Sequence, residues 1–501
     1  MNGVHVFDVA GRAYAYDRTR QDLVAVAPEL ADLLAGRTSG GSSGDSSGDS
    51  SGDSSGDSSG DTSGSSAARE ALARAQREDG LFRGVAPLLT PRPPDPACDR
   101  DLEHLVLTVT EECDLRCAYC VHGAGLDWVR SHSSRRMDLG TARRAVAWFL
   151  DRCRPDRPPT VSFYGGEALR HPALIRAVTA QVRAHPRGAE AMLALDSNGC
   201  DWDDAAVAMM AAERMHVQVS LDGPPAIHDR YRRDREGRPT CARILANLDR
   251  LLDRDATAAA RLSFVATLAP PVDLDAVARF YADLPPFARR GLPAPHVRVN
   301  FANLAGQAWP PAQEAAHGLP PVPEQIDRAR ETWFAAVAAG RRAELSPVVR
   351  ALFEPDLIRF HHRSRAELGP TWVPGGNCRP GRRKLHVTAD GRLQPCERTG
   401  DGIVLGDLKT RGGIDPAAVR TLERKFHAAV ADRCGDCWAL RLCAVCYAAL
   451  AGGRPGAGKD SVPEQVCERF RSRAETTLAL MVRITELPPE RREWLENTRL
   501  V

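Results

Sequence analysis

The stretch TVTEECDLRCAYC, residues 108–120, places three cysteines on one loop in the spacing CxxxCxxC: Cys113, Cys117 and Cys120. The loop follows an apolar run, His104–Thr110, that has the length and composition of a buried strand. A structural zinc ion takes four protein ligands, and an iron–sulfur cube takes one thiolate for each of its four irons. Three thiolates therefore predict either a zinc or scattered-thiol arrangement, or a cube with one iron open to a further ligand.

Composition narrows the classes of protein that this chain can form. It has 501 residues, 43% of them hydrophobic and 26% charged, which predicts a globular protein of several domains. The formal net charge of +2 does not favour nucleic acid as a partner. Neither a signal peptide nor a membrane-spanning run is visible, so we expect a cytoplasmic protein without membrane contact. In that compartment, fourteen cysteines favour metal ligation or catalysis over disulfides.

Short apolar runs alternate with helical patterns from about residue 98 to residue 300. This alternation predicts βα units that share a parallel sheet. Six strands over about 200 residues fit a partial barrel as well as an open sheet. The runs after His104–Thr110 are Thr160–Tyr164, Met192–Asp196, Val217–Leu221, Leu262–Leu268 and His296–Asn300, and the clearest helical patterns are Thr141–Arg152 and Cys241–Leu252.

Three further motifs stand at the ends of the next three runs: FYGGE at 163–167, DSNG at 196–199 and SLDGP at 220–224. Each motif alone is also compatible with an ordinary turn. Together with the cysteine loop they occupy the ends of successive strands, the face where barrel enzymes place their chemistry. In this combination, with HDRYR at 228–232, the chain resembles the radical S-adenosylmethionine superfamily over about residues 102–300.

The resemblance implies a radical SAM barrel that holds one [4Fe–4S] cluster and S-adenosylmethionine. The open iron would chelate the amino and carboxylate groups of the cofactor, and a 5′-deoxyadenosyl radical would then take a hydrogen from the substrate. The implied residues are Cys113, Cys117 and Cys120 for the cluster, Tyr119 beside it, Gly165, Gly166 and Glu167 for the amino group, Asn198 for the ribose, and Ser220 and Arg232 for the carboxylate. Asp222 is a candidate base, or else the cap of a turn.

Seven cysteines follow residue 375, and the stretch CGDCWALRLCAVC, residues 434–446, alone is typical of a zinc site. With CRPGRRKLHVTADGRLQPC at 378–396 it resembles the SPASM domain, which carries two auxiliary [4Fe–4S] clusters. The last gap is CxxC where that family has CxxxC. The resemblance implies a distal cluster on Cys434, Cys437, Cys443 and Cys467, and a nearer one on Cys378, Cys396 and Cys446.

Three thiolates at the nearer cluster leave one iron open. It would bind a substrate thiolate, or be closed by Asn377, His386 or Cys98. A zinc ion at 434–446 is the alternative, but it leaves Cys378, Cys396 and Cys467 without a role. Of the cysteines without motif spacing, Cys153 and Cys241 are expected to be small buried hydrophobes, whereas Cys98 and Cys200 have no assigned role.

The first 83 residues have a composition of their own, with SSGD repeated between residues 42 and 61. That stretch predicts a flexible linker, residues 39–66, of natural or engineered origin. Around it we expect strands at Val4–Val9, Ala13–Tyr16 and Leu23–Val26, and helices at Pro28–Leu34 and Ala67–Arg77. This pattern resembles the winged-helix-like element of ribosomal peptide maturases that captures a leader peptide by strand addition. A small stabilising domain is the alternative.

The expected fold class is α/β, a partial (β/α)6 TIM-like barrel between a small α+β module and a cysteine-rich domain. The expected domains are 1–83, the barrel at 98–300, a connector with at least one helix (Glu324–Ala339) at 301–375, the SPASM domain at 376–470, and a terminal helix at 471–501.

We predict a radical SAM enzyme with three [4Fe–4S] clusters that oxidatively modifies a precursor peptide and takes electrons from a flavodoxin or ferredoxin. A thioether crosslink is the first expectation, and a carbon–carbon or cyclophane crosslink or an epimerisation is the next. The alternatives are formylglycine formation as in sulfatase maturation and a zinc-stabilised peptide-binding adaptor without catalysis.

Overall fold

The computed structural model describes residues 3–37, 62–84, 86–95, 98–120, 122–123, 131–302, 317–376, 378–409, 412–450 and 461–498. Most of the expected linker, residues 39–61, and the candidate ligand Asn377 therefore lie outside the described residues. Within the described part of the chain, no helix is both long and apolar enough to cross a membrane.

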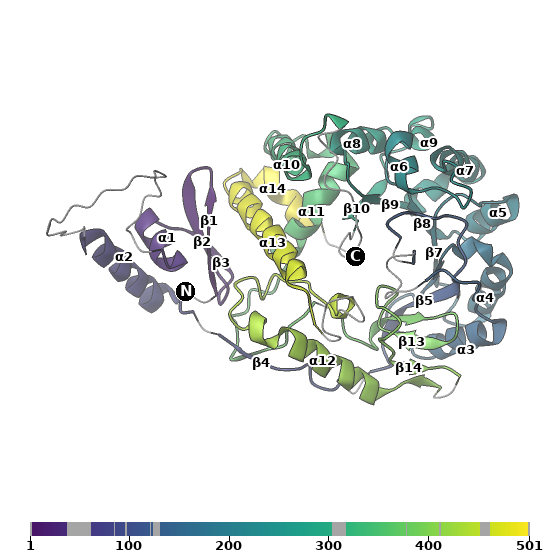
Figure 1. The fold of residues 1–501 in the computed structure, drawn as a ribbon, viewed down its shortest axis with the longest axis horizontal. Helices are drawn as coiled ribbons and strands as arrows, with labels where there is room; N and C mark the ends of the chain where they lie inside the picture. Colours follow the sequence, from purple (N-terminus) through teal and green to yellow (C-terminus); the bar gives the residue numbers. More distant parts are fainter. Residues whose placement is uncertain are drawn as a thin grey trace, which may run out of the picture.

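The six expected barrel strands form one sheet in chain order, and each pairs in parallel with the next. Helices lie along the outer side of the arc that these strands make (Figure 1). The alternation of buried and half-buried residues along β9 reflects one face packed under helices and one face turned to the barrel interior. The strands are β5 (Leu102–Thr110), β6 (Thr160–Gly165), β7 (Met192–Ser197), β8 (His216–Ser220), β9 (Leu262–Leu268) and β10 (His296–Phe301).

Two of the outer helices, Leu139–Leu150 and Cys241–Arg254, lie within two residues of the bounds that the helical patterns predict. α3 begins after Asp138, whose carboxylate accepts the backbone N–H of Thr141 at 2.7 Å and so caps the helix. The helices are α3 (Leu139–Leu150), η2 (Ala168–Arg170), α4 (Pro172–Ala184), α5 (Asp204–Ala212), α6 (Pro225–Tyr231), α7 (Cys241–Arg254), η3 (Ala256–Arg261), α8 (Leu274–Ala282) and α9 (Pro285–Ala288).

The sheet does not stop where the cysteine-rich region begins. β12 pairs in parallel with β5, with His386 opposite Val106, and β13 to β15 add antiparallel strands beyond it. The boundary that we expect near residue 376 is therefore not a break in the sheet. The elements are β12 (Arg383–Val387), β13 (Arg392–Gln394), β14 (Gly406–Asp407), β15 (Gly413–Ile414), α12 (Pro416–Cys434), η6 (Tyr447–Ala449), α13 (Glu464–Thr485) and α14 (Pro489–Asn497).

The expected connector is helical and packs into the body of the protein. α11 lies against β10 and α8 on one side and against α13 and α14 on the other. Helices α10, α11, α13 and α14 share a second hydrophobic core, separate from that of the barrel, and Trp333 of α10 is fully buried in it. The elements are α10 (Val322–Ala338), η5 (Arg342–Glu344), α11 (Pro347–His361) and β11 (Thr371–Trp372), which pairs with β4 (Leu88–Leu89).

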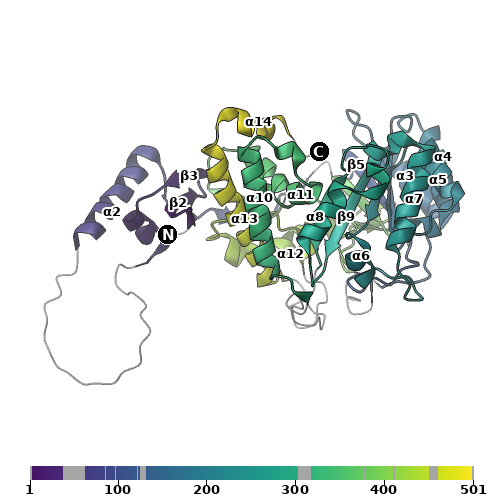
Figure 2. The same cartoon turned by 90° about the horizontal axis from the view of Figure 1, so that it is seen from above.

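The N-terminal module is a three-stranded antiparallel sheet with two helices, and it lies beside α13 (Figure 2). Its second helix begins at Thr62, five residues before the expected start at Ala67, and ends in a π-helical turn. The elements are β1 (Val4–Val9), β2 (Arg12–Asp17), β3 (Asp22–Ala25), α1 (Pro28–Ala35), α2 (Thr62–Arg74) and η1 (Ala75–Asp79).

Candidate active site

The CxxxCxxC loop follows β5 directly, and the chain that comes after the SLDGP motif holds it in place. The backbone N–H of Arg116 donates to the carbonyl of Arg233 at 2.8 Å, and that of Ala118 donates to the carbonyl of Tyr231 at 3.0 Å. The first cysteine of the loop is buried and the other two are half-buried. The geometry of this loop therefore depends on a segment more than a hundred residues further along the chain.

The two glycines of FYGGE let the end of β6 lie directly against the cysteine loop. A Cβ atom added to Gly165 would lie 2.0 Å from the carbonyl oxygen of Thr110, and one added to Gly166 would lie 2.4 Å from that of Glu112. The backbone N–H groups of Gly166 and Glu167 donate to these same carbonyls at 3.0 and 2.8 Å. Only glycine fits this approach, so the motif is a structural requirement of the loop.

The carboxylate of Glu167 is 1% exposed and joins the ends of β6 and β7. It accepts the backbone N–H of Asn198 at 2.6 Å and the hydroxyl of Ser197 at 3.0 Å. Burial raises the pKa of Glu167 to about 8. The amide of Asn198 donates to the carboxylate of Asp114 at 2.7 Å, next to the first cysteine. Glu167 and Asn198, both predicted cofactor contacts, therefore lie beside the cysteine loop.

Arg232, Tyr119 and Asp222 form a buried cluster on the other side of the loop. Arg232 is 7% exposed and donates to the Tyr119 hydroxyl at 3.0 Å, while its Nε has no hydrogen-bond partner among the described residues. The Tyr119 hydroxyl donates to Asp222, whose other oxygen accepts the N–H of Thr267 at 2.9 Å. Both oxygens of Asp222 thus have partners, as in a structural carboxylate. Ser220 ends β8 half-buried.

The three loop thiols are held in surroundings that disfavour their charged form. Burial raises the pKa of Cys113 and of Cys120, and it raises the pKa of Cys117 to about 11. The Cys117 thiolate raises the pKa of Cys113 further, and the Cys120 thiolate does the same to Cys117. Buried thiols of this kind gain most from a bound metal, because it stabilises the thiolate.

These surroundings fit an iron–sulfur cluster with S-adenosylmethionine beside it. The thiols supply three soft ligands, and the Nε of Arg232, which has no partner among the described residues, suits a carboxylate. Within the described ranges, no three His, Cys, Asp or Glu side chains converge closely enough to hold a single metal ion.

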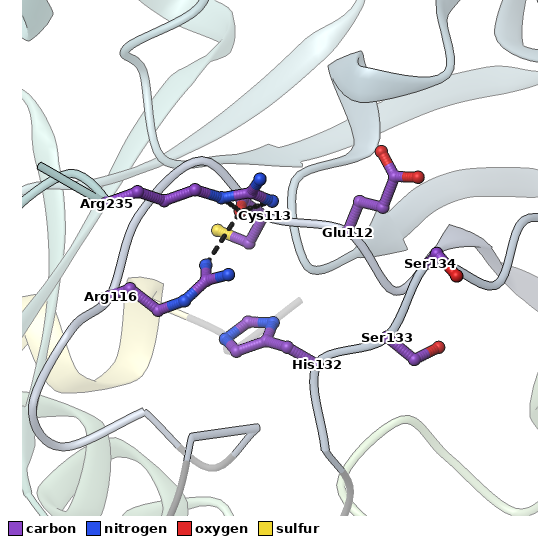
Figure 3. A pocket seen from close by; sticks show the side chains of 7 residues that line it. All are labelled: Glu112, Cys113, Arg116, His132, Ser133, Ser134 and Arg235. Atoms are coloured by element: carbon purple, nitrogen blue, oxygen red, sulfur yellow. Dashed lines mark hydrogen bonds between the residues drawn. The ribbon is translucent and has the colours of Figure 1, made fainter.

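A cavity of about 310 Å³ opens beside the buried cysteine of the loop (Figure 3). Arg116 and Arg235 both donate to the backbone carbonyl of Cys113, at 2.9 Å and 2.8 Å. Sequence reasoning missed this pair of arginines, because nothing in their spacing relates the two positions. The lining residues are Glu112, Cys113, Arg116, His132, Ser133, Ser134 and Arg235.

The resemblance divides the seven C-terminal cysteines into two groups. Burial raises the pKa of Cys434 to about 12, and the neighbouring thiolates of Cys437, Cys443 and Cys467 contribute to the increase. These four are the residues that the resemblance assigns to a distal cluster.

The other three cysteines form the second group. Burial raises the pKa of Cys378 and of Cys396, the latter to about 11, and the Cys446 thiolate raises both. These are the residues that the resemblance assigns to the nearer cluster, and that assignment stays a prediction.

Two of the candidates for a fourth ligand at the nearer group are placed by the structure. His386 is fully buried, with one ring nitrogen 2.7 Å from the Thr108 hydroxyl and the other 3.0 Å from the Gln394 side chain. Both ring nitrogens therefore have partners within the sheet, which does not favour His386 as an iron ligand. Cys98 lies beside Gly381 and its charged neighbours are Asp95, Asp99 and Arg382.

The remaining cysteines are held within the protein in different ways. Cys200 and Cys241 are buried, and Cys153 is half-buried with its thiol 3.2 Å from the carbonyl of Leu150. The expectation that Cys241 is a small buried hydrophobe is confirmed, since it lies in the barrel core.

The chain is similar in part of its sequence to GTP 3′,8-cyclases and in fold to solved AdoMet-binding proteins, which supports the resemblance to the radical SAM family. The chain is 31% identical over 144 residues to GTP 3′,8-cyclase of Mycobacterium sp. (strain KMS), over 26% of this chain and 36% of the cyclase. It is 32% identical over 133 residues to GTP 3′,8-cyclase of Streptomyces coelicolor, over 26% of this chain and 37% of the cyclase. The match thus spans about a third of the length of these relatives.

Solved structures share the fold at low sequence identity. Histidine-tagged anSMEcpe with bound AdoMet superimposes with a TM-score of 0.54 at 17% identity, over 75% of this chain and 97% of that one. Native anSMEcpe with bound AdoMet and Kp18Cys peptide gives 0.53 at 17% identity, over 76% and 99%. No protein-family model matches the chain.

Proposed function

We propose that this chain is a radical SAM peptide maturase that carries two auxiliary clusters in a C-terminal SPASM domain and installs an oxidative crosslink, with a thioether as the first candidate. One observation carries the proposal. The CxxxCxxC loop, the two glycines that bring the end of β6 against it, and the buried Arg232 all lie at the carboxyl-end side of the same parallel sheet. Seven further cysteines in two groups support the auxiliary clusters.

The residues of the barrel have distinct tasks in this proposal. When bound, the cluster and S-adenosylmethionine supply a 5′-deoxyadenosyl radical that abstracts hydrogen. Gly165 and Gly166 bring backbone polar groups to the cofactor's amino group, and the carboxylate of Glu167 keeps the two strand ends in register. The Nε of Arg232, which has no partner among the described residues, would bind the carboxylate, and Tyr119 orients the guanidinium by accepting its hydrogen bond at 3.0 Å.

The N-terminal module offers an edge at which a peptide can add as a strand. β3 is the last strand of its sheet, and it pairs only with β2 among the described residues. The N–H of Val26 donates to the carbonyl of Ala13 at 3.0 Å, which makes these two residues a hydrogen-bonded pair. Because such pairs alternate, the backbone groups of Ala25 and Leu23 point away from β2. They would receive the leader peptide.

The nearer group of Cys378, Cys396 and Cys446 supports the choice of a thioether. With three protein thiolates, the fourth iron of a cube would accept the thiolate of a substrate cysteine. The cluster would also take the second electron of the oxidation, and a flavodoxin or ferredoxin would supply the electron that starts each turnover.

Formylglycine formation is the second candidate. It is favoured by the shared fold with anSMEcpe, whose structures hold AdoMet and either the Kp18Cys or the Cp18Cys peptide. The fold alone does not carry this reaction, and the two engaged oxygens of Asp222 give it no free base at that position.

The test is reductive cleavage of S-adenosylmethionine by the anaerobically reconstituted chain. We expect roughly twelve irons per chain from three cubes, and 5′-deoxyadenosine on addition of dithionite. The Cys117→Ala variant should lose this activity, whereas Cys153→Ala should keep it. Colourless protein that binds zinc and yields no 5′-deoxyadenosine would support the non-catalytic adaptor instead.

The product is tested by coexpression with a small open reading frame from the same locus, followed by mass spectrometry. A crosslink removes two hydrogens from the peptide, whereas epimerisation leaves its mass unchanged.

A further inference from the structure

Arg18, at the end of β2, reaches out of the N-terminal module and into the cysteine-rich region. It is 0% exposed, although arginine is almost never fully buried without partners. Its Nη1 donates to the carbonyl of Gly435 at 2.7 Å and to the carbonyl of Cys437 at 2.9 Å. Both acceptors lie in the turn Cys434–Cys437, which joins the first two cysteines of the distal group.

This turn begins at Cys434, the last residue of α12, where the final carbonyls of the helix lack partners within it. A cation at this end also interacts favourably with the helix dipole. Arg18 supplies both the donors and the charge. Two backbone groups also donate to this turn, the N–H of Cys437 to Cys434 and the N–H of Leu440 to Cys437, each at 3.2 Å.

Further contacts near Arg18 hold the N-terminal module against the cysteine-rich region. The ring of His5 stacks on Trp438 with centroids 3.8 Å apart and planes inclined by 7°. Arg441 donates to the carbonyl of Thr19 at 2.9 Å, so the residue that follows Arg18 is tied to the same loop. Gly3 leaves room for the arginine, because a Cβ atom there would lie 2.8 Å from its Nε.

We infer that Arg18 is a positioning residue for the metal that Cys434, Cys437, Cys443 and Cys467 bind, so that the peptide-recognition module forms one wall of the distal site. The inference rests on the proposed function for the identity of the metal, and on the contacts above for the role of Arg18. The module then has two tasks: it presents β3 to the peptide and holds the turn that carries two metal ligands.

The inference has an electrostatic consequence. An iron–sulfur cluster with four thiolates is negatively charged, and nearby cations and hydrogen bonds favour its reduced form. Removing the Arg18 guanidinium takes away such a cation. The reduction potential of a distal cluster that survives the substitution should therefore shift to more negative values.

The experiment uses the full chain with the three loop cysteines replaced, Cys113→Ala, Cys117→Ala and Cys120→Ala, so that only auxiliary sites remain. Iron and zinc are counted after anaerobic reconstitution, and the clusters are followed by electron paramagnetic resonance during a redox titration. We expect roughly eight irons in this background from two cubes. Arg18→Ala should lose the distal signal and roughly half of the iron, or keep it at a lower potential.

The matched control is Arg12→Ala, which replaces an exposed arginine at the start of β2 whose guanidinium lies over the ring of Tyr14, 5.6 Å from its centroid. It should keep both clusters at unchanged potentials. Because Arg18→Ala could unfold the region and lose the signals of both clusters, Arg18→Lys provides a second test. Lysine keeps the charge but not the fork of donors, so it should retain the nearer cluster and alter the distal one.

Full metal content with an unchanged distal spectrum and potential in both Arg18 variants would overturn the inference. Zinc in place of iron in the unmutated chain would instead contradict the proposed function. In that case zinc loss in Arg18→Ala still tests the positioning role, since the turn and its two cysteines are the same.

Discussion

The carboxylate of Glu167 accepts the backbone N–H of Asn198 across 2.6 Å. This bond joins the third residue of the GGE motif, at the end of β6, to the DSNG turn at the end of β7. Because Asn198 in turn donates to Asp114 in the cysteine loop at 2.7 Å, three segments separated in sequence act as one unit. A change at any of them should therefore disturb cofactor binding as a whole.

Gly166→Ala should abolish cluster and cofactor binding. The new methyl group would lie 2.4 Å from the carbonyl oxygen of Glu112 and 2.6 Å from its carbonyl carbon, both of them backbone atoms. The loop must move away from β6, which carries the neighbouring thiol out of place. We expect iron content to fall by about four per chain and S-adenosylmethionine binding, measured by equilibrium dialysis, to weaken at least 10-fold.

Gly402→Ala is the control for this substitution. Nothing lies within 4 Å of a Cβ atom at Gly402, so iron content and binding should equal those of the unmutated chain. If Gly166→Ala binds the cofactor normally, the close approach of β6 to the loop does not exist in the assembled enzyme.

Arg232→Lys should weaken S-adenosylmethionine binding while leaving the cluster in place. The guanidinium of Arg232 donates to Tyr119 and keeps one buried nitrogen without a partner among the described residues, whereas lysine offers one ammonium on a flexible stem. Losing a charged hydrogen bond of about 1.5–3 kcal/mol corresponds to roughly 10- to 150-fold in affinity. Isothermal titration with the cofactor measures the effect. Arg233→Lys, at the exposed neighbouring position, should bind as the unmutated chain does.

Local patterns are enough to predict the barrel strands. β9 runs over the expected residues, Leu262–Leu268, and the other five barrel strands differ from expectation by no more than two residues at either end. Apolar periodicity indicates which residues are buried. Because a parallel sheet is buried on both faces, the same pattern predicts both the strands and the helices that cover them. The pairing of β12 with β5 cannot be predicted in this way. The sequence of the β12–β13 hairpin determines its own turn, but it does not determine which distant strand the hairpin pairs with.

The same distinction separates the site residues that sequence reasoning found from those it missed. The cysteines and the glycines have chemistry or backbone requirements that only a few residue types meet, so their spacing is informative. Arg18, Arg116 and Arg235 act by donating to backbone carbonyls of cysteine loops. An arginine can reach such a carbonyl from many positions in the chain, so the residues next to it in sequence do not indicate that the contact exists.

Cys446→Ala should remove the nearer auxiliary cluster alone. Cys446 is the residue whose thiolate raises the pKa of both Cys378 and Cys396, and it follows the shortened gap of the cysteine motif. We expect iron to fall from roughly twelve to roughly eight per chain. Reductive cleavage of S-adenosylmethionine should continue, while formation of modified peptide should stop. Loss of cofactor cleavage as well would mean that the two sites are not independent.

His104 should make the chain less stable as the pH falls from 6.5 toward 4. Burial lowers the pKa of His104 to about 4, and its Nε2 lies 2.6 Å from the hydroxyl of Ser162. Between these pH values His104 binds a proton in the unfolded chain but not in the folded chain, so the free energy of unfolding decreases on acidification. The contribution is on the order of 1–3 kcal/mol, after allowance for partial exposure. Urea unfolding of the metal-free chain at pH 7.5 and 5 measures it.

The His104→Gln variant isolates this contribution, because glutamine does not titrate but can still hydrogen-bond to Ser162. Its loss of stability between the two pH values should be smaller than that of the unmutated chain. Equal losses would show that His104 is not the group responsible.

Ala25→Pro should weaken binding of the precursor peptide without affecting cofactor cleavage. Ala25 is exposed on β3, and its N–H points away from β2, so proline removes a donor to an added strand while sparing the ladder to β2. We expect affinity for a fluorescent leader peptide to fall about 10-fold, the effect of losing roughly 1.4 kcal/mol. Ala25→Val keeps the N–H and favours the strand, so it is the matched control and should bind normally. Unchanged affinity in the proline variant would place the leader elsewhere than on the edge of β3.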